Sequence, residues 1–119
     1  MNPQDILEHF ILLTGLDKKE APPWLPLCSR YARQLRAQLK NPEQETQNAA
    51  LLSTVAAEMA YAKYTEICAA RETESFSAGD ITVRAYGEGA VRAAKAVAEE
   101  ALCSINDLLD DRAFVFRKC

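Results

Sequence analysis

The sequence predicts an all-α protein, a bundle of about four helices with a long strand-containing loop between the last two helices. Apolar residues recur at three- and four-residue spacing through most of the chain, which is typical of amphipathic helices. The segment 74–89 departs from this pattern: apolar and polar residues alternate there, and it holds three of the four glycines. We therefore expect one helical domain over residues 1–119, with an interaction arm at 74–89 and a C-terminal tail at 110–119.

Composition favours an ordinary globular domain. The chain has 119 residues, of which 49% are hydrophobic and 26% are charged, and this length fits a single domain. The formal net charge of −3 lacks the basic excess typical of nucleic-acid-binding proteins. No apolar run approaches the ~20 residues of a membrane-spanning helix, and the first residues lack the basic start of a signal peptide. We expect no membrane partner.

The first helix is expected to begin at Asn2-Pro3 and to end at Gly15. Asparagine is a favoured N-cap, proline suits the first helical position, and glycine readily adopts the left-handed conformation that ends helices. The apolar face of this short helix is wide. Its excess of apolar surface indicates contacts on more than one side.

The second helix is expected from about 24 to 40, after a helical turn at 17–21 and a break at the prolines that follow. Its apolar positions are Trp24, Leu27, Cys28, Tyr31, Leu35 and Leu39. Its opposite side carries a basic row of Arg30, Arg33, Arg36 and Lys40. This row is a possible charged contact face for phosphates or for carboxylates of a partner, and the alternative is a face that contacts only solvent.

Two long amphipathic helices are expected at about 44–72 and 88–109. The first is rich in alanine, which favours helix and permits close approach of neighbouring helices. Its apolar stripe comprises Leu52, Val55, Ala56, Met59, Ala60, Tyr64 and Ile67. The stripe of the last helix comprises Val91, Ala94, Ala98, Ala101, Leu102, Ile105 and Leu109. The longer helix is predicted to lie at the centre of the bundle.

Between these helices, residues 80–85 alternate in the manner of a short strand. A lone strand needs hydrogen-bond partners, so it pairs either within a hairpin or with the same segment of another copy. The C-terminal tail contains Phe114, Val115 and Phe116. This aromatic segment either packs on its own bundle or docks into another protein.

The sequence lacks the residue patterns of a catalytic centre. The single histidine, His9, has no evident partner, and neither a phosphate-binding loop nor a nucleophile elbow occurs. None of the four cysteines forms a CxxC pair, and we expect Cys28, Cys68 and Cys103 to be free thiols in apolar helical stripes. We therefore expect no enzyme activity, no cofactor and no metal.

The order of these segments resembles the head–tail connector, or adaptor, proteins of tailed bacteriophages and prophages. A short helix ending in TGL and a helix after a proline-containing turn come first. A long alanine-rich helix containing AEMAYAKY, the segment SFSAGDITV and a last amphipathic helix follow. Many connector proteins carry a Ser-x-x-x-Gly-Asp-x-Ser/Thr-Val pattern between their last two long helices, and this pattern is matched by Ser75, Gly79, Asp80, Thr82 and Val83.

The resemblance implies a structural role in the virion. Connector proteins form a homo-oligomeric ring beneath the portal, extend the channel through which DNA passes, and contact stopper proteins on the tail side. DNA then passes without sequence-specific binding, and the protein resides in the host cytoplasm only during assembly. The subunit interface would comprise Phe76, Ile81, Val83 and Tyr86. The residues that dock to the portal or a neighbour would be Phe114, Val115 and Phe116.

Two other functions are compatible with the sequence. One is a small helical regulatory or nucleic-acid-binding module that uses the Arg30, Arg33, Arg36 and Lys40 face, although the prolines before residue 24 do not resemble a helix-turn-helix. The other is a small enzyme or ligand-binding bundle, which the missing catalytic pattern disfavours.

Overall fold

The computed structural model describes the backbone of residues 1–76 and 88–109, and the side chains of residues 1–71 and 89–109. This part of the chain is helical, which confirms the predicted all-α class. Its elements are α1 (Pro3–Thr14), the 3-10 helix η1 (Pro22–Trp24), α2 (Leu25–Gln38), α3 (Gln44–Gln47), α4 (Ala49–Phe76), α5 (Glu88–Ser104) and the 3-10 helix η2 (Asn106–Leu108). The strand expected at 80–85 lies outside the described residues.

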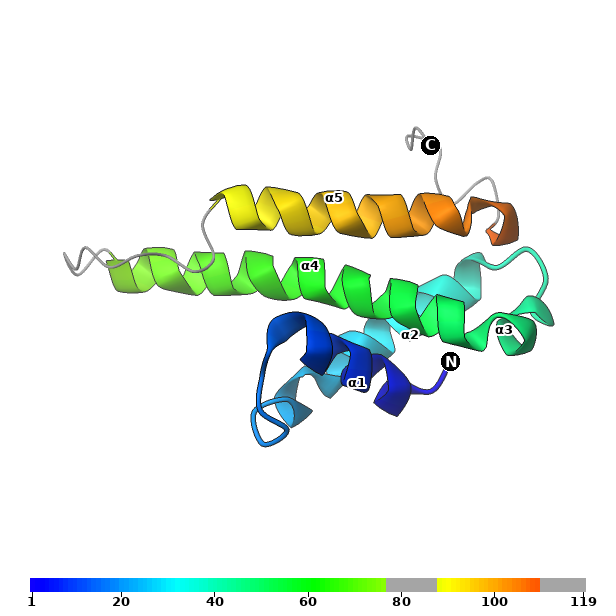
Figure 1. Cartoon of the computed structure of the whole chain (residues 1–119), viewed down its shortest axis with the longest axis horizontal. Helices are drawn as coiled ribbons and strands as arrows, with labels where there is room; N and C mark the ends of the chain where they lie inside the picture. Colours follow the sequence, from blue (N-terminus) through cyan, green and yellow to red (C-terminus); the bar gives the residue numbers. More distant parts are fainter. Residues whose placement is uncertain (77–87, 110–119) are drawn as a thin grey trace.

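Helix α4 is the central element, as predicted (Figure 1). Helix α5 runs antiparallel along it, α2 crosses behind it, and α1 lies below α4 in this view, in front of α2 (Figure 1). Helices α1 and α2 also pack against each other. The molecule is thin, with a shortest principal extent of 17 Å, so it has two broad faces. We call the face on which α1 lies the α1 face, and the opposite face, which α2 crosses, the α2 face.

The ends of α1 confirm the sequence prediction. The Asn2 side chain accepts a hydrogen bond from the Gln4 backbone N–H at 3.0 Å, which satisfies one of the free donors of the first turn. Gly15 has φ +74°, and its N–H donates to the Ile11 carbonyl at 2.8 Å. This left-handed conformation is one that glycine adopts without steric cost, and it ends the helix.

The proline-rich segment folds as predicted, with a turn before the second helix. The N–H groups of Glu20 and Ala21 donate to the Asp17 carbonyl at 2.9 and 3.1 Å. The 3-10 helix η1 then leads directly into α2, where Pro26 occupies the first turn and therefore removes no helical hydrogen bond. Helix α2 begins at Leu25, within one residue of the predicted start.

Three predictions about the long helices were wrong. Helix α4 continues to Phe76, four residues beyond the expected end at 72 and into the segment expected to be the arm. The helix expected at 44–72 is interrupted at Asn48, whose side-chain amide donates to the Gln44 carbonyl at 3.1 Å and so closes α3 as a separate turn. The helix expected at 88–109 ends at Ser104. Beyond it, Leu109 forms an antiparallel bridge with Leu39, and the Lys40 N–H donates to the Leu108 carbonyl at 3.0 Å. This contact with the end of α2 replaces the last turns of the expected helix.

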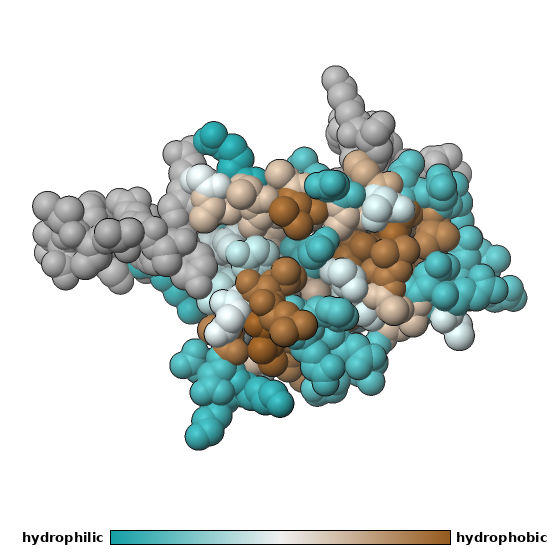
Figure 2. Space-filling view, in the orientation of Figure 1, coloured by the Kyte–Doolittle hydropathy of each residue, from teal (hydrophilic) through white to brown (hydrophobic). Residues whose placement is uncertain are grey.

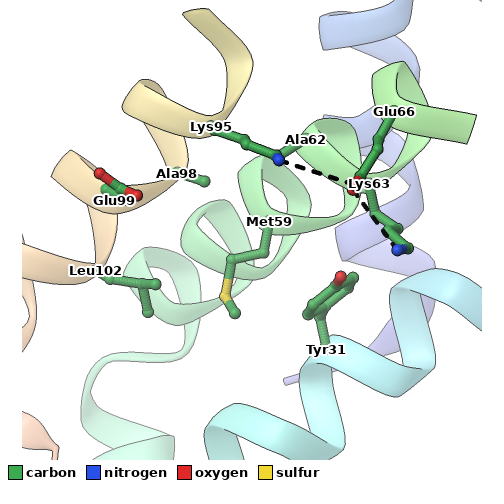
Figure 3. A pocket seen from close by; sticks show the side chains of 9 residues that line it. All are labelled: Tyr31, Met59, Ala62, Lys63, Glu66, Lys95, Ala98, Glu99 and Leu102. Carbon is green, nitrogen blue, oxygen red and sulfur yellow. Dashed lines mark ion pairs between the residues drawn. The ribbon is translucent and has the colours of Figure 1, made fainter. Parts of the chain in front are cut away.

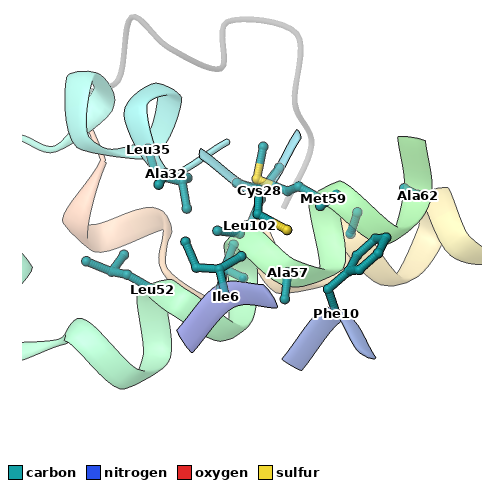
Figure 4. Close-up of a cluster of buried hydrophobic side chains, with 14 of the residues drawn as sticks. Ile6, Phe10, Cys28, Ala32, Leu35, Leu52, Ala57, Met59, Ala62 and Leu102 are labelled. Carbon is teal, nitrogen blue, oxygen red and sulfur yellow. The ribbon is translucent and has the colours of Figure 1, made fainter. Parts of the chain in front are cut away.

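The core lies where α1, α2 and α5 meet α4 (Figure 4). The predicted apolar stripes supply most of it, since most of their residues are buried. Ile67 and Val91, which were also assigned to the stripes, are only partly buried and lie outside the core. Ala56, Ala57 and Ala60 of α4 are fully buried. Because alanine adds little volume, these positions let the neighbouring helices approach α4 closely.

An aromatic cluster joins α1, η1 and α4. The ring of Tyr64 packs edge-on against Phe10 and Trp24, with centroid distances of 5.4 and 4.8 Å. Phe10 and Trp24 also contact each other, and the Arg71 guanidinium lies 5.7 Å from the centroid of the Trp24 ring. Such pairs each contribute about 0.5–1.5 kcal/mol beyond their burial. The cluster fixes how α1 and the start of α2 lie on α4.

The cysteines fulfil the prediction only in part. Cys28 is buried and free, and burial raises its pKa to about 11, which makes the thiol unreactive near neutral pH. Cys68 is also free and half-buried. The prediction for Cys103 was wrong, because this residue is disulfide-bonded. Cys103 is only half-buried on α5, so its sulfur is not enclosed in the core as that of Cys28 is.

We expect Phe10→Ala to lower the free energy of unfolding by about 3–5 kcal/mol, because it leaves a cavity among three helices. Urea denaturation followed by circular dichroism measures the loss. The matched control is Leu12→Ala in the same helix, where the side chain is 80% exposed, and its effect should stay within about 0.5 kcal/mol. Equal losses in the two variants would contradict the placement of Phe10 in the core.

Candidate interaction surfaces

The basic row predicted on α2 divides into two parts. Arg30 and Arg33 are exposed on the side of α2 opposite the buried Cys28 and Leu35. The Arg30 guanidinium lies over the Tyr31 ring, 5.6 Å from its centroid. Lys40 is exposed at the end of the row, beside the backbone contact with Leu108. Arg30 and Arg33 therefore form the outward pair of this face.

Arg36 is engaged within the chain instead. Its Nε donates to Glu45 Oε1 at 2.7 Å, and its Nη2 donates to Oε2 at 3.1 Å and to the Met1 carbonyl at 3.1 Å. The ammonium of Met1 donates to Glu45 Oε2 at 2.7 Å. Hydrogen bonds from Arg36 and then from the Met1 ammonium lower the pKa of Glu45 to about 2. This charged triad ties the N-terminus to the end of α2 and to α3.

A groove of about 210 Å³ opens on the α2 face, between α2, α4 and α5 (Figure 3). Its apolar lining comes from Tyr31, Met59, Ala62, Ala98 and Leu102. Its rim is charged: Glu66 accepts ion pairs from Lys63 at 3.6 Å and from Lys95 at 3.8 Å, and Glu99 lies near Lys95 on α5. The groove has room for an apolar side chain and polar groups around it that can fix the orientation of a partner.

Four large apolar side chains in the described part of the chain are exposed to solvent. Leu12 is 80% exposed, and Leu13, Leu51 and Val97 are each about two-fifths exposed. Figure 2 shows hydrophobic surface over the end of α1, over the middle of α5, and where the start of α4 meets the end of α5. Exposed apolar surface gathered on one face of a small protein typically marks an interaction site. In the sequence, the wide apolar pattern of α1 indicated this exposed apolar surface. No pattern in the sequence indicated that Leu51 and Val97 are exposed.

The same face carries acidic groups. Asp5, Glu8 and His9 line a second groove of about 410 Å³ between α1 and the start of α4. Further along α4, burial and the charge of Glu100 raise the pKa of Glu58, and His9 opposes this shift. Glu58 and Glu100 therefore repel each other.

The other predicted contact residues lie outside the part of the chain whose side chains are described. Phe76 ends α4, but its side chain is not among the described ones. Ile81, Val83 and Tyr86 of the arm, and Phe114, Val115 and Phe116 of the tail, are also outside the described residues. Their roles stay predictions.

Within residues 1–76 and 88–109, no cluster of His, Cys, Asp or Glu has the arrangement of a metal site. In the same ranges, no helix combines the length and the apolar character needed to cross a membrane. Comparison of the chain with protein-family models, curated proteins and solved structures finds no match. The two faces described above are therefore the candidate sites of interaction.

We expect Glu45→Gln to lower the free energy of unfolding by about 1 kcal/mol at pH 7, since it removes a carboxylate that binds two cations at a partly exposed site. The folded-state pKa of Glu45 is depressed from 4.5 to about 2, so its contribution is present above pH 4.5. It is lost as the pH falls towards 2, where the variant and the wild type should converge.

Urea denaturation at several pH values between 2 and 7 tests this. Glu43→Gln is the matched control, because Glu43 is exposed two residues away and should leave stability unchanged. A difference between Glu45→Gln and wild type that persists undiminished at pH 2 would show that the carboxylate charge is not its cause.

Proposed function

We propose that this protein is a structural subunit of a bacteriophage or prophage particle, a ring-forming head–tail connector that binds beneath the portal and extends the DNA channel. The observation that carries the proposal is the exposed apolar α1 face, with Leu12 80% exposed. A monomer gains nothing from this exposure, whereas a subunit of an assembly buries such a face against its neighbour. The resemblance of the sequence around SFSAGDITV to connector proteins supplies the identity of the assembly.

The all-helical architecture is compatible with this role. Helices α4 and α5 form a long antiparallel pair, and the arm of residues 74–89 comprises the end of α4, the start of α5 and the segment between them. In a connector ring the arm would contact the adjacent subunit through Phe76, Ile81, Val83 and Tyr86. The tail would dock to the portal or to a neighbour through Phe114, Val115 and Phe116. The protein would act without enzyme activity or a cofactor, at the head–tail interface of the virion.

The alternative of a regulatory or nucleic-acid-binding module has less support. It requires Arg30, Arg33, Arg36 and Lys40 to act together on phosphates, but Arg36 binds the Glu45 carboxylate. Neutralising one of four cations reduces the number of phosphates the face can contact, and with it the affinity for nucleic acid. Salt-dependent DNA binding that is lost on replacing Arg30 and Arg33 would favour this alternative.

We expect Ile81→Asp combined with Val83→Asp to abolish assembly, because two charges would replace the apolar edge of the predicted strand. Light scattering of the purified protein over a range of concentrations reports the mass in solution. Thr82→Asp is the matched control: it adds a charge to the opposite edge of the same segment and should preserve assembly. Unchanged assembly in the double variant would exclude the arm from the subunit contact.

The proposal as a whole is tested by electron microscopy of the protein alone and after mixing with the portal protein of the same phage genome. Closed rings, or co-migration with the portal ring on size-exclusion chromatography, support a connector. A protein that forms no ring alone and does not co-migrate with the portal overturns the proposal.

A further inference from the structure

The disulfide of Cys103 has one candidate partner within the chain. The sequence contains four cysteines; Cys28 and Cys68 are free thiols, whereas Cys103 is disulfide-bonded. The cysteine that remains is Cys119, at the end of the C-terminal tail. The tail of residues 110–119 lies outside the described residues. A bond between Cys103 and Cys119 would join the end of this tail to α5.

Both ends of a tail joined in this way would be fixed beside the groove on the α2 face, which opens between α2, α4 and α5 (Figure 3). Leu109, the residue before the tail, forms a bridge with Leu39, directly after α2. Cys103 follows Glu99 by four residues, so the two lie on the same side of α5, and Glu99 lines the groove. A chain that begins beside α2 and ends on α5 passes across the opening between these helices.

The length and pattern of the tail suit this path. Residues 110–119 reach about 33 Å when fully extended, so they can span the groove and return to Cys103. The middle of the tail holds Phe114, Val115 and Phe116. Alternate side chains of an extended segment point to the same side, so both phenylalanine rings can face the groove while Val115 points away from it.

The lining of the groove suits an aromatic ring. Tyr31, Met59 and Leu102 come from three different helices and surround the same space (Figure 3). Methionine is flexible and its sulfur makes favourable contacts with aromatic rings, and pairs of aromatic rings attract each other when they pack edge to face. The groove therefore offers both an adaptable side chain and an aromatic partner to a phenylalanine.

Charge on the rim of the groove favours the same path. Glu99 lies one helical turn before Cys103 on the α5 rim, and Lys95 of this rim pairs with Glu66. Arg117 and Lys118 directly precede Cys119. A bond between Cys119 and Cys103 would bring these two cations close to the Glu99 carboxylate, which is a modest attraction at an exposed site.

We propose that the tail folds back into the α2–α4–α5 groove of its own chain, with Phe114 and Phe116 facing the groove and Cys119 joined to Cys103. The inference goes beyond the proposed function and does not depend on it, because the tail and the groove belong to one chain. A tail held in this groove is withheld from a portal or a neighbouring subunit. The disulfide therefore controls when the aromatic segment becomes available for docking.

The bond forms and opens by thiol–disulfide exchange. When it forms, the two thiols lose two protons and two electrons, and a small disulfide such as glutathione disulfide accepts them and becomes two thiols. When it opens, a dithiol such as dithiothreitol loses two protons and two electrons and closes its own disulfide, and both cysteines regain their thiols. Opening leaves the tail attached only at Leu109, and the phenylalanine rings leave the groove.

Peptide mapping tests the covalent part. The full chain is incubated in dilute solution with glutathione disulfide, denatured, alkylated and digested without reductant. We expect a linked peptide that contains Cys103 and Cys119, alkylation of Cys28 and Cys68 alone, and an undigested mass of one chain. Pairing of Cys103 with any other thiol, a link between two chains, or four alkylated cysteines overturns the proposal.

Met59 provides a specific probe of the groove. The chain has two methionines, so labelling their methyl groups with carbon-13 gives two signals, and Met1, which pairs with Glu45, serves as the internal control. An aromatic ring beside a methyl group displaces its chemical shift. We expect Phe114→Ala combined with Phe116→Ala to move the Met59 signal of the oxidised protein. Val115→Ala, at the opposite side of the same segment, should leave it in place.

The same signal reports the release of the tail. Adding dithiothreitol to the wild type should move the Met59 signal to its position in the double phenylalanine variant, and Cys119→Ser should do so without reductant. Cys68→Ser is the matched control, because it removes a free thiol and should leave the signal unchanged. Circular dichroism of every variant establishes that the helices are retained.

Each result bears on the proposal. A Met59 signal that is identical in the oxidised wild type, the reduced wild type and the double phenylalanine variant overturns it. A displacement that disappears on dilution shows that the groove takes the tail of another copy, which also overturns it. These measurements need no ring and no portal, so their failure leaves the connector proposal standing. Expected results from Met59, together with a protein that forms no ring and ignores the portal, would retain the tail contact and reject the connector.

Discussion

The fold depends on the burial of α4 against three other helices. Its buried residues are not confined to one stripe: Leu52, Val55, Ala56, Ala57 and Ala60 are all at most 1% exposed. Helices α1, α2 and α5 each place their apolar side on α4. A helix that supplies one wall to three partners needs small side chains, because each partner must come close without displacing the next. The alanines of α4 meet this requirement, and the aromatic cluster around Tyr64 then sets the orientation of α1 and α2.

Polar contacts position the ends of the chain rather than support its core. The triad of Met1, Arg36 and Glu45 links three segments, and the pairing of Leu39 with Leu109 brings the chain after α5 to the end of α2. The triad is partly exposed, and the pairing of Leu39 with Leu109 is a single backbone bridge. Each of these contacts therefore contributes on the order of 1 kcal/mol to stability. Their effect is geometric: they hold α2 at a fixed position behind α4, which keeps the groove beside Tyr31 open on one face while α1 occupies the other.

The sequence predicted the end of a helix correctly where a capping residue sets it. It predicted the end less well where a side-chain hydrogen bond or a contact with a distant segment sets it. Asn2 and Gly15 mark the ends of α1 through hydrogen bonds within a few residues, so the pattern was sufficient. The break at Asn48 is also local, but the hydrogen bond from its side chain to the Gln44 carbonyl has no signature in the apolar pattern. Beyond the end of α5 at Ser104, the chain contacts the end of α2, and periodicity does not report such a contact. Arg36 shows the same difficulty at the candidate site. The spacing of basic residues along α2 does not reveal that Arg36 forms an ion pair with Glu45, nine positions later. The groove on the α2 face combines three helices and had no sequence signature.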